Sequence, residues 1–398
     1  IVGMKVLRAY KTEIDPNNVQ RTLLLKHAGA ARFTFNWGLS EKQKAYEAKE
    51  KVPNAIELHR RINALKKTDF PWMYDVSKCS PQEALRNLDR AYDNFYHKVK
   101  AKKSGTFKGK VGFPRFKSKH RGIGSFRLTG TIKVESNRIF LPNLKWLSLK
   151  EHDYIPTDGI KILSATVSEK AGRWFVSVQV EQERTEPKVK DDAIVGVDLG
   201  IKSLAVCSDG KTFENPKALR SRLAQLKRLQ QHVSRKQKGS QNRKKAARKV
   251  AKLHLHISNI RKDGLHKLTT ELTKTKSVVV IEDLNVSGMM KNHCLAQAIQ
   301  DLGLGEFRRQ LDYKGIWNGC KIVVADRYFP SSKLCSSCGC VNLSLTLADR
   351  EWTCDCGVHH DRDRNASVNL EQHGKIVVAS SVKTLNSPIE TKALALRK

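Results

Sequence analysis

The chain has 398 residues, which is more than one ordinary hydrophobic core accommodates and favours two or three folding units. Its 74 lysine and arginine residues outnumber its 39 aspartate and glutamate residues, which gives a formal net charge of +35. This charge indicates a polyanionic partner such as nucleic acid, although a ribosomal or other basic protein would also fit it. There is no apolar run of about 18 residues and no signal-peptide pattern, so we expect a cytoplasmic protein without a membrane segment.

The segment from Asp15 to about Lys102 is predicted to be helical. Between Asp15 and about Lys49, apolar residues recur at spacings of three and four, and Pro16 suits a first helical turn. More helix is predicted to about Lys102, with an apolar face opposite a basic face that carries Arg86 and Arg90. We expect these two arginines to contact phosphate.

The pattern changes after a segment rich in glycine and lysine at residues 101–121. Short alternating runs up to residue 181 predict an antiparallel sheet or small barrel, with Val176, Val178 and Val180 on its buried face. The polar segment 183–192 is the expected domain boundary.

Beyond that boundary, the pattern is typical of an α/β unit. Apolar runs at residues 193–197, 203–207 and 277–281 predict strands, and two long helices are predicted between the second and third of them. Residues 215–262 contain 16 lysines or arginines and no acid in 48 positions, which indicates phosphate contact, with a merely solvated surface as the alternative. The expected contact residues are Arg235, Lys236, Arg243, Lys244, Lys245, Arg248 and Lys249.

Three acidic residues are candidates for a metal-dependent active site. Asp198 ends the first apolar strand, Glu282 ends a later one, and Asp363 precedes a short predicted helix. The carboxyl ends of strands in an α/β sheet gather ligand-binding groups, and converging carboxylates require a hard cation among them. Two such ions about 4 Å apart support phosphodiester cleavage. Asp283 and Asp361 lie close enough in sequence to be alternatives.

Five of the nine cysteines are crowded into one segment, which favours metal over disulfides in this setting. Cys335 and Cys338, separated by 15 residues from Cys354 and Cys356, form a four-thiolate zinc-ribbon pattern. The second pair has a shortened spacing, so Cys340 or His359 remains an alternative ligand. A structural zinc is expected, which would organise the loop that delivers Asp363.

Several motifs occur in an order that resembles the TnpB family, the insertion-sequence nucleases related to type V CRISPR effectors. The motifs in the first half are ARFTFN at 31–36, PWM at 71–73, ALRNL at 84–88 and GFPRFK at 112–117. Those in the second half are GVDLG at 196–200, EDL at 282–284, GEF at 305–307, PSS at 330–332, the paired cysteines and HDRDRNA at 360–366.

The resemblance implies a multidomain α+β and α/β fold. Its expected parts are a wedge-type β-barrel at 1–30 and 103–185, a helical recognition lobe at 31–102, a RuvC-like RNase H domain at 191–330 and 358–373, and an inserted zinc ribbon at 331–357. The basic hairpin at 215–262 would line the nucleic-acid channel. Residues 374–398 lack periodicity and are expected to form a mobile tail.

The resemblance also implies an activity. It identifies Asp198, Glu282 and Asp363 as the catalytic and Mg²⁺-binding (or Mn²⁺-binding) residues, and it implies a guide RNA and double-strand cutting of DNA beside a short adjacent motif. Arg115 and Lys117, in the GFPRFK motif, are further expected nucleic-acid contacts. A prokaryotic protein acting at the nucleoid, with a monomer favoured, is expected.

Two other activities fit many of the same residues. One is a DNA-binding regulator without cleavage, against which the presence of all three acids counts. The other is a DNA-strand transferase, which would need the same acids. The lack of a recognisable helix-turn-helix module argues against the transferase, whereas acyl transfer and ATP hydrolysis lack their motifs altogether.

Overall fold

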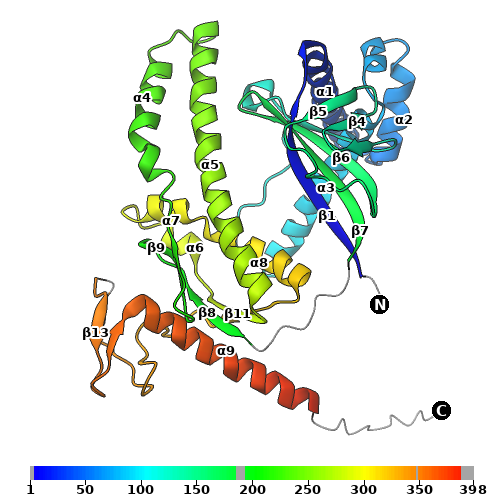
Figure 1. Cartoon of the computed structure of the whole chain (residues 1–398). Helices are drawn as coiled ribbons and strands as arrows, with labels where there is room; N and C mark the ends of the chain where they lie inside the picture. The colour runs from blue at the N-terminus through cyan, green and yellow to red at the C-terminus, as the bar shows by residue number, and fades with distance from the viewer. Residues whose placement is uncertain (1–3, 185–192, 347, 387–398) are drawn as a thin grey trace, which may run out of the picture. The chain divides into compact units, whose positions relative to one another are not determined.

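The computed structural model describes residues 4–184, 193–346 and 348–386, and the chain divides into two compact units, residues 1–185 and 186–398 (Figure 1). The division falls within the polar segment expected to be a boundary, most of which lies outside the described residues. No helix in the described ranges has the length and apolar character needed to cross a membrane.

The first unit is built on a seven-stranded antiparallel sheet with the order β2-β6-β7-β1-β5-β4-β3. The strands are β1 (Met4–Asp15), β2 (Ser125–Leu128), β3 (Lys133–Glu135), β4 (Arg138–Leu141), β5 (Lys145–Leu149), β6 (Ile160–Lys170) and β7 (Arg173–Arg184). The helices are α1 (Asn18–Glu47), α2 (Ala55–Leu65) and α3 (Cys79–Lys103), with short 3-10 turns at Pro71–Asp75 and Lys119–Arg121.

The predicted alternating strands are confirmed, with Val176, Val178 and Val180 fully buried on β7. The pattern missed β1, whose buried positions are Tyr10, Thr12 and Ile14. Only two of these three are apolar, so no strong period is visible. Pairing with β7 from Met4 to Ile14 defines the strand instead.

The boundary expected between residues 30 and 31 is wrong. It falls inside α1, which runs unbroken from Asn18 to Glu47. One hydrophobic cluster joins α1 and α3 to the sheet and includes Leu24, Leu85 and Val176. Because sheet and helices share this core, they fold as one unit rather than as a barrel and a separate lobe.

The second unit contains a five-stranded sheet with the order β10-β9-β8-β11-β12, in which β8, β11 and β12 are parallel and β9 and β10 antiparallel. Its strands are β8 (Ile194–Asp198), β9 (Ser203–Cys207), β10 (Thr212–Glu214), β11 (Val278–Glu282) and β12 (Lys321–Ala325), with a separate pair of β13 (Glu351–Thr353) and β14 (His359–Asp361). The helices are α4 (Leu223–Ser234), α5 (Gln241–Thr275), α6 (Val286–Met289), α7 (Ala296–Leu302), α8 (Leu304–Asn318) and α9 (Arg362–Asn386), with a 3-10 turn at Arg220–Arg222.

Helix α9 lies along β8 and β11, as Figure 1 shows. The mobile tail expected from residue 374 is therefore wrong up to Asn386, and residues 387–398 lie outside the described part. Gly374 does not end the helix. A Cβ there would lie 3.3 Å from Ile194 Cγ2 and collide with Val280, so the glycine allows the helix to approach the sheet closely. Val377 and Val378 continue that contact.

Candidate active site and metal centre

Asp198 and Glu282 end two neighbouring parallel strands. The register pairs Ile281 of β11 with Val197 of β8, and its continuation by one residue places Glu282 beside Asp198. Adjacent strands lie roughly 4.8 Å apart, and residues at the same register share a face. Both acids are partly buried. The strand pairing thus joins two acids that are far apart in sequence.

Asp363 reaches the same place on α9, which runs antiparallel to β8. Close packing of the helix is possible because β8 has glycine at position 196, where a Cβ would lie 2.5 Å from Glu371 N and closer still to Ser367 O. Asp363 is one helical turn before Ser367 and so lies at the carboxyl end of β8. Its Oδ2 is 4.0 Å from the point where a Cβ would lie if residue 200 were not glycine.

The neighbouring acids have other partners. Asp361 is exposed and accepts a hydrogen bond from Arg364 N at 2.8 Å, which is the position of a helix N-cap. Asp283 is exposed and forms an ion pair with Arg327 at 2.6 Å. Both alternatives left open by the sequence therefore have partners of their own.

The electrostatics show that the three acids interact. Burial, followed by repulsion from Glu282 and then Asp363, raises the pKa of Asp198 to about 8, while the positive charge of Arg362 opposes the shift. Arg350 lies 3.9 Å from Asp363 Oδ1. A cation placed among these oxygens would offset their repulsion.

A cavity of about 450 Å³ opens beside Glu282. Its lining combines acidic and basic groups, among them Glu282, Arg327, Ser331, Lys333 and Arg362. Ser331 Oγ donates a hydrogen bond to Glu282 Oε1. The sequence reading assigned no role to Ser331, although it lies in the PSS motif, nor to Arg350, for which we find no sequence signal.

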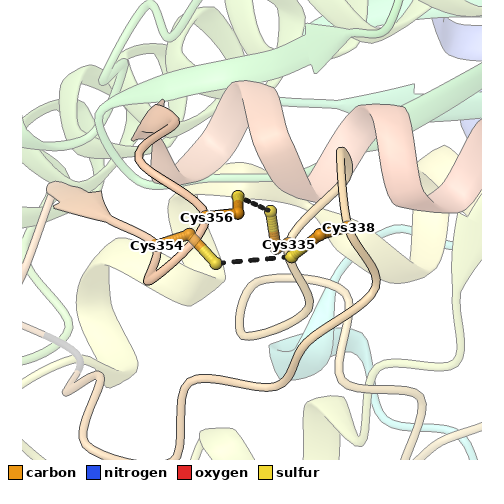
Figure 2. Close-up of side chains that lie close together, drawn as sticks. All are labelled: Cys335, Cys338, Cys354 and Cys356. Atoms are coloured by element: carbon orange, nitrogen blue, oxygen red, sulfur yellow. Dashed lines mark hydrogen bonds between the residues drawn. The ribbon is translucent and has the colours of Figure 1, made fainter.

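The structure gathers the four cysteines of the predicted ribbon. Their Sγ atoms lie within 4.8 Å of one another, with Cys335–Cys356 at 3.8 Å and Cys338–Cys354 at 3.5 Å (Figure 2). Sulfur atoms at the corners of a tetrahedral zinc site are about 3.8 Å apart, because each Zn–S bond is about 2.3 Å. The thiols therefore fit zinc. In the described ranges the three carboxylates are not gathered this tightly.

The shortened second cysteine pair still presents both thiols to the site. Cys340 uses its carbonyl to accept a hydrogen bond from Cys335 N at 2.8 Å, and His359 Nδ1 lies 3.1 Å from Thr353 Oγ1. Neither alternative ligand belongs to the thiol cluster. His360 Nε2 is 3.1 Å from Cys335 Sγ, which is hydrogen-bond range to sulfur. Hydrogen bonding from Cys340 N, Cys335 and Cys354 lowers the pKa of Cys338 to about 6, whereas burial and hydrogen bonds among the thiols raise the pKa of Cys354 and Cys356.

The predicted basic hairpin is formed by α4 and α5, which stand side by side in Figure 1. A small apolar cluster that includes Leu226, Leu253 and Ile257 holds the two helices together. The exposed members of the predicted contact set are Arg235, Lys244, Lys245, Arg248 and Lys249, whereas Lys236 and Arg243 are partly buried. Arg243 Nη1 donates to the carbonyls of Val233 and Lys236 at 3.0 and 2.9 Å, so this arginine also closes the turn.

In the first unit, the predicted contacts form two groups. Arg86 and Arg90 surround Glu83, which is only 2% exposed and which sequence reasoning missed; Arg86 Nη1 donates to it at 2.7 Å. Arg115 and Lys117 line a cavity of about 390 Å³. The structure does not bring these four residues into one group.

Three family models match the chain. "Probable transposase" of the OrfB_IS605 type matches residues 177–293, the "Cas12f1-like, TNB domain" matches residues 305–370, and a "Helix-turn-helix domain" of OrfB_IS605 proteins matches residues 4–51. The helix-turn-helix match counts against the prediction that the chain lacks a helix-turn-helix module. In the structure, however, that range folds as β1 and the single helix α1.

Curated relatives extend over nearly the whole chain. A "Putative RNA-guided DNA endonuclease" from Streptomyces pristinaespiralis is 40% identical over 92% of this chain and 89% of its own length. InsQ from Escherichia coli K12, with the same description, is 33% identical over 94% of each chain. A third relative with that description, from Mycobacterium tuberculosis, is 32% identical over 92% of this chain and 86% of its own length.

Solved structures share the fold at low sequence identity. The Cas12f1–sgRNA–target DNA complex aligns with a TM-score of 0.54 at 13% identity, covering 92% of this chain and 99% of that one. The mini-RNA-guided endonuclease Cas-phi3 aligns with a TM-score of 0.52 at 9% identity over 92% of both chains. Together with the family models and the full-length relatives, they identify the chain as a member of the TnpB family of IS605-type transposon proteins.

Proposed function

We propose that the chain is an RNA-guided DNA endonuclease of an insertion sequence, which cuts double-stranded DNA beside a short adjacent motif. The observation that carries the proposal is the meeting of Asp198, Glu282 and Asp363 at one end of the parallel strands. Relatives named as RNA-guided DNA endonucleases support it. The proposed partners are a guide RNA and target DNA, and the proposed assembly is a monomer acting at the nucleoid.

The domain assignment is part of the proposal. We assign a RuvC-like RNase H fold to residues 191–330 and 358–373, extended by the rest of α9 to Asn386, and the mixed sheet with acids at its parallel strand ends supports the assignment. The zinc ribbon would occupy residues 331–357. The seven-stranded sheet and helices α1 to α3, which share one core, would together supply the wedge and recognition parts.

The three carboxylates have the donor chemistry for a hard divalent cation. Asp198, Glu282 and Asp363 would hold Mg²⁺ or Mn²⁺ through oxygen, and the mutual repulsion of these carboxylates, which adds to the effect of burial on the pKa of Asp198, supports a cation among them. When bound, the metal supplies an activated water and stabilises charge on the leaving oxygen of a phosphodiester.

The chain's own cations would orient the substrate. Arg350 beside Asp363, together with Lys333 and Arg362 on the cavity wall, presents positive charge next to the acids. Such groups attract the phosphate backbone without regard to base sequence. In this proposal base pairing with the guide RNA selects the target, and these residues align the bond to be cut.

The test is cleavage of guide-matched DNA by protein purified with its RNA. Asp198→Ala and Glu282→Gln should each reduce Mg²⁺-dependent cutting by at least about 100-fold, because each removes a charge that holds the metal against the reacting phosphate. Binding of matched DNA, measured by filter retention, should change little. Sequencing the co-purified RNA supplies the target.

Asp283→Asn is the matched control, because this acid adjoins Glu282 in sequence but pairs with Arg327. It should retain cutting within a few-fold. Full activity of Asp198→Ala would remove the assignment of the acids. Matched DNA that is bound tightly by the wild-type protein but never cut would favour a guided regulator.

DNA-strand transfer is a second candidate, because the OrfB_IS605 model is described as a transposase. A transferase would use the same three acids. Product analysis separates the two: an endonuclease releases free 5′ and 3′ ends on the target, whereas a transferase joins transposon ends to target strands. Joined products dependent on Asp198 would replace the endonuclease proposal.

A further inference from the structure

One short segment joins the two candidate metal centres. Residues 331–336, here called the bridging segment, begin with Ser331, whose hydroxyl donates to Glu282 Oε1. Four residues later comes Cys335, one of the four clustered thiols (Figure 2). Ser331 is 3% exposed, so its hydroxyl is withdrawn from solvent and directed to the carboxylate.

Helix α9 holds the bridging segment through two buried asparagines. Asn369 Nδ2 donates to the carbonyls of Ser331 and Leu334 at 2.7 and 2.6 Å. One turn earlier, Asn365 Nδ2 donates to Leu334 O at 2.7 Å, and Asn365 Oδ1 accepts from Ser336 N at 3.0 Å. Residues four apart share a helix face, so the two side chains follow the segment in one line.

These asparagines are buried at a cost that their contacts must offset. Asn365 is 2% exposed and Asn369 is fully buried. A buried amide without partners is destabilising, whereas donation to backbone carbonyls offsets that cost. Asn369 Oδ1 finds no hydrogen-bond partner in the described structure, so the Nδ2 donations are what favour the buried position of this side chain. The contacts fix the backbone of the bridging segment from Ser331 to Ser336, and they attach it to the helix that carries Asp363.

The hydrogen bond from Ser331 determines how Glu282 can act. A hydroxyl that donates to one carboxylate oxygen fixes the rotation of the group and leaves Oε2 available to a ligand. Groups behind a ligating carboxylate tune metal affinity in this way, typically by 10- to 100-fold. The position of Ser331 depends in turn on the bridging segment, whose other end is fixed when Cys335 binds metal.

We propose that Ser331 is a positioning residue for Glu282, and that Asn365 and Asn369 couple its position to the cysteine site. Zinc binding at Cys335, Cys338, Cys354 and Cys356 then strengthens the binding of a divalent cation at the acidic site. The cleavage readout of this inference rests on the proposed nuclease function, whereas the cation-binding readout does not.

The first test is Mn²⁺ binding by calorimetry on the zinc-loaded protein purified with its RNA. Ser331→Ala should weaken Mn²⁺ binding about tenfold with zinc content unchanged. Ser331→Thr, which keeps the hydroxyl, should restore most of the affinity. Ser344→Ala, the same change at an exposed serine elsewhere in the ribbon, should have no effect.

The cleavage readout should follow the binding readout. Ser331→Ala should raise the Mg²⁺ concentration for half-maximal cutting by a similar factor, with a smaller change in the rate at saturating Mg²⁺. Equal Mn²⁺ affinity of wild-type protein and Ser331→Ala would overturn the role of Ser331. Normal Mn²⁺ binding without any cutting would count against the nuclease proposal alone.

A double-mutant comparison tests the coupling. Cys335→Ser should lower Mn²⁺ affinity although it lies outside the acidic site, and adding Ser331→Ala to it should cause little further loss. Thermal unfolding identifies variants that fail to fold, and Asn369→Ala, which removes the amide that donates to the bridging segment, then replaces Cys335→Ser. The coupling would be overturned if the loss of Mn²⁺ affinity from Ser331→Ala simply added to the loss from Cys335→Ser, and likewise to the loss from Asn369→Ala.

Discussion

Acids that are close in sequence have different surroundings in this protein. Glu282 is partly buried and accepts a hydrogen bond from Ser331, whereas Asp283 is exposed and forms an ion pair with Arg327. Asp361 caps α9, whereas Asp363, in the first turn of that helix, repels Asp198. Alternation along a strand and rotation around a helix turn residues only one or two positions apart toward different partners.

The cysteine residues allow a test of ligand identity. Cys354→Ser should lower bound zinc to well below one ion per chain, because a hydroxyl does not replace a thiolate in a structural site. Cys340→Ser, at an exposed thiol outside the cluster, should leave zinc content unchanged. Metal analysis of the purified proteins measures both. Loss of zinc in the Cys340 variant alone would reassign the ligand.

At the scale of elements, α9 connects the most features. Its first turn carries Asp363, its buried asparagines hold the bridging segment, and its middle packs on β8 at Gly196. Helix and sheet approach closely because no side chain lies between them at that position.

Gly196→Ala should therefore destabilise the second unit. The new Cβ would meet the backbone of Ser367 and Glu371, which cannot move as the end of a flexible side chain can. We expect a loss of about 3 kcal/mol, the upper part of the range for overpacking. Gly305→Ala on α8, where a Cβ meets nothing within 4 Å, is the control and should be neutral or stabilising. Denaturant unfolding measures both, and equal midpoints would contradict the packing argument.

The contact between α5 and α8 contains a buried lysine. Lys314 Nζ donates to Thr269 Oγ1 and Thr270 Oγ1, both at 2.7 Å, and to His266 O at 3.0 Å. Burial lowers the pKa of Lys314 from its ordinary 10.5 to about 8. Between these two values the unfolded chain binds more protons than the folded chain, so the free energy of unfolding rises with pH.

Lys314→Met should remove that pH dependence. The stability of the wild-type protein relative to this variant should increase as the pH is raised from 8 to 10, and should be constant below pH 7. Urea unfolding at several pH values measures the difference. Lys267→Met, at an exposed lysine of α5, is the control. If the stability of the wild-type protein relative to Lys314→Met fell as the pH rose, the pKa of Lys314 would not be lowered in the folded state.

At the scale of the whole molecule, the net charge of +35 is unevenly distributed. Residues 215–262 contribute 16 cations and no acid, and most of the predicted contact residues on α4 and α5 are exposed. Repulsion among these cations disfavours the close approach of α4 and α5, and the apolar contacts between the two helices offset part of that repulsion. Bound RNA phosphates would offset the repulsion.

Reversal of Lys244, Lys245 and Arg248 to Glu should weaken RNA binding and reduce its salt dependence. If each contacts one phosphate of single-stranded RNA, the slope of log K against log salt should become shallower by about 2. Reversal of the dispersed, exposed Lys51, Lys133 and Lys321 gives the same change in net charge and is the control. Equal slopes in the two variants would show that only total charge matters.

Much of the candidate site could be predicted from the sequence. Apolar strands ending in Asp198 and Glu282, the cysteine spacing and the acid-free segment are all local patterns, because burial and helical or strand periodicity leave a record in neighbouring residues. The same reasoning missed β1, whose pairing with β7 involves residues distant along the chain.

Only the tertiary structure decided which local features meet. The register of β8 and β11 aligns Asp198 with Glu282, and the fit of α9 against Gly196 brings in Asp363 while leaving Asp361 as a cap. Gly374, where the sequence predicts the start of a mobile tail, lies in α9 and contacts the sheet. Local patterns record the preferences of single elements, whereas the partners of a side chain depend on packing between elements that no short stretch of sequence contains.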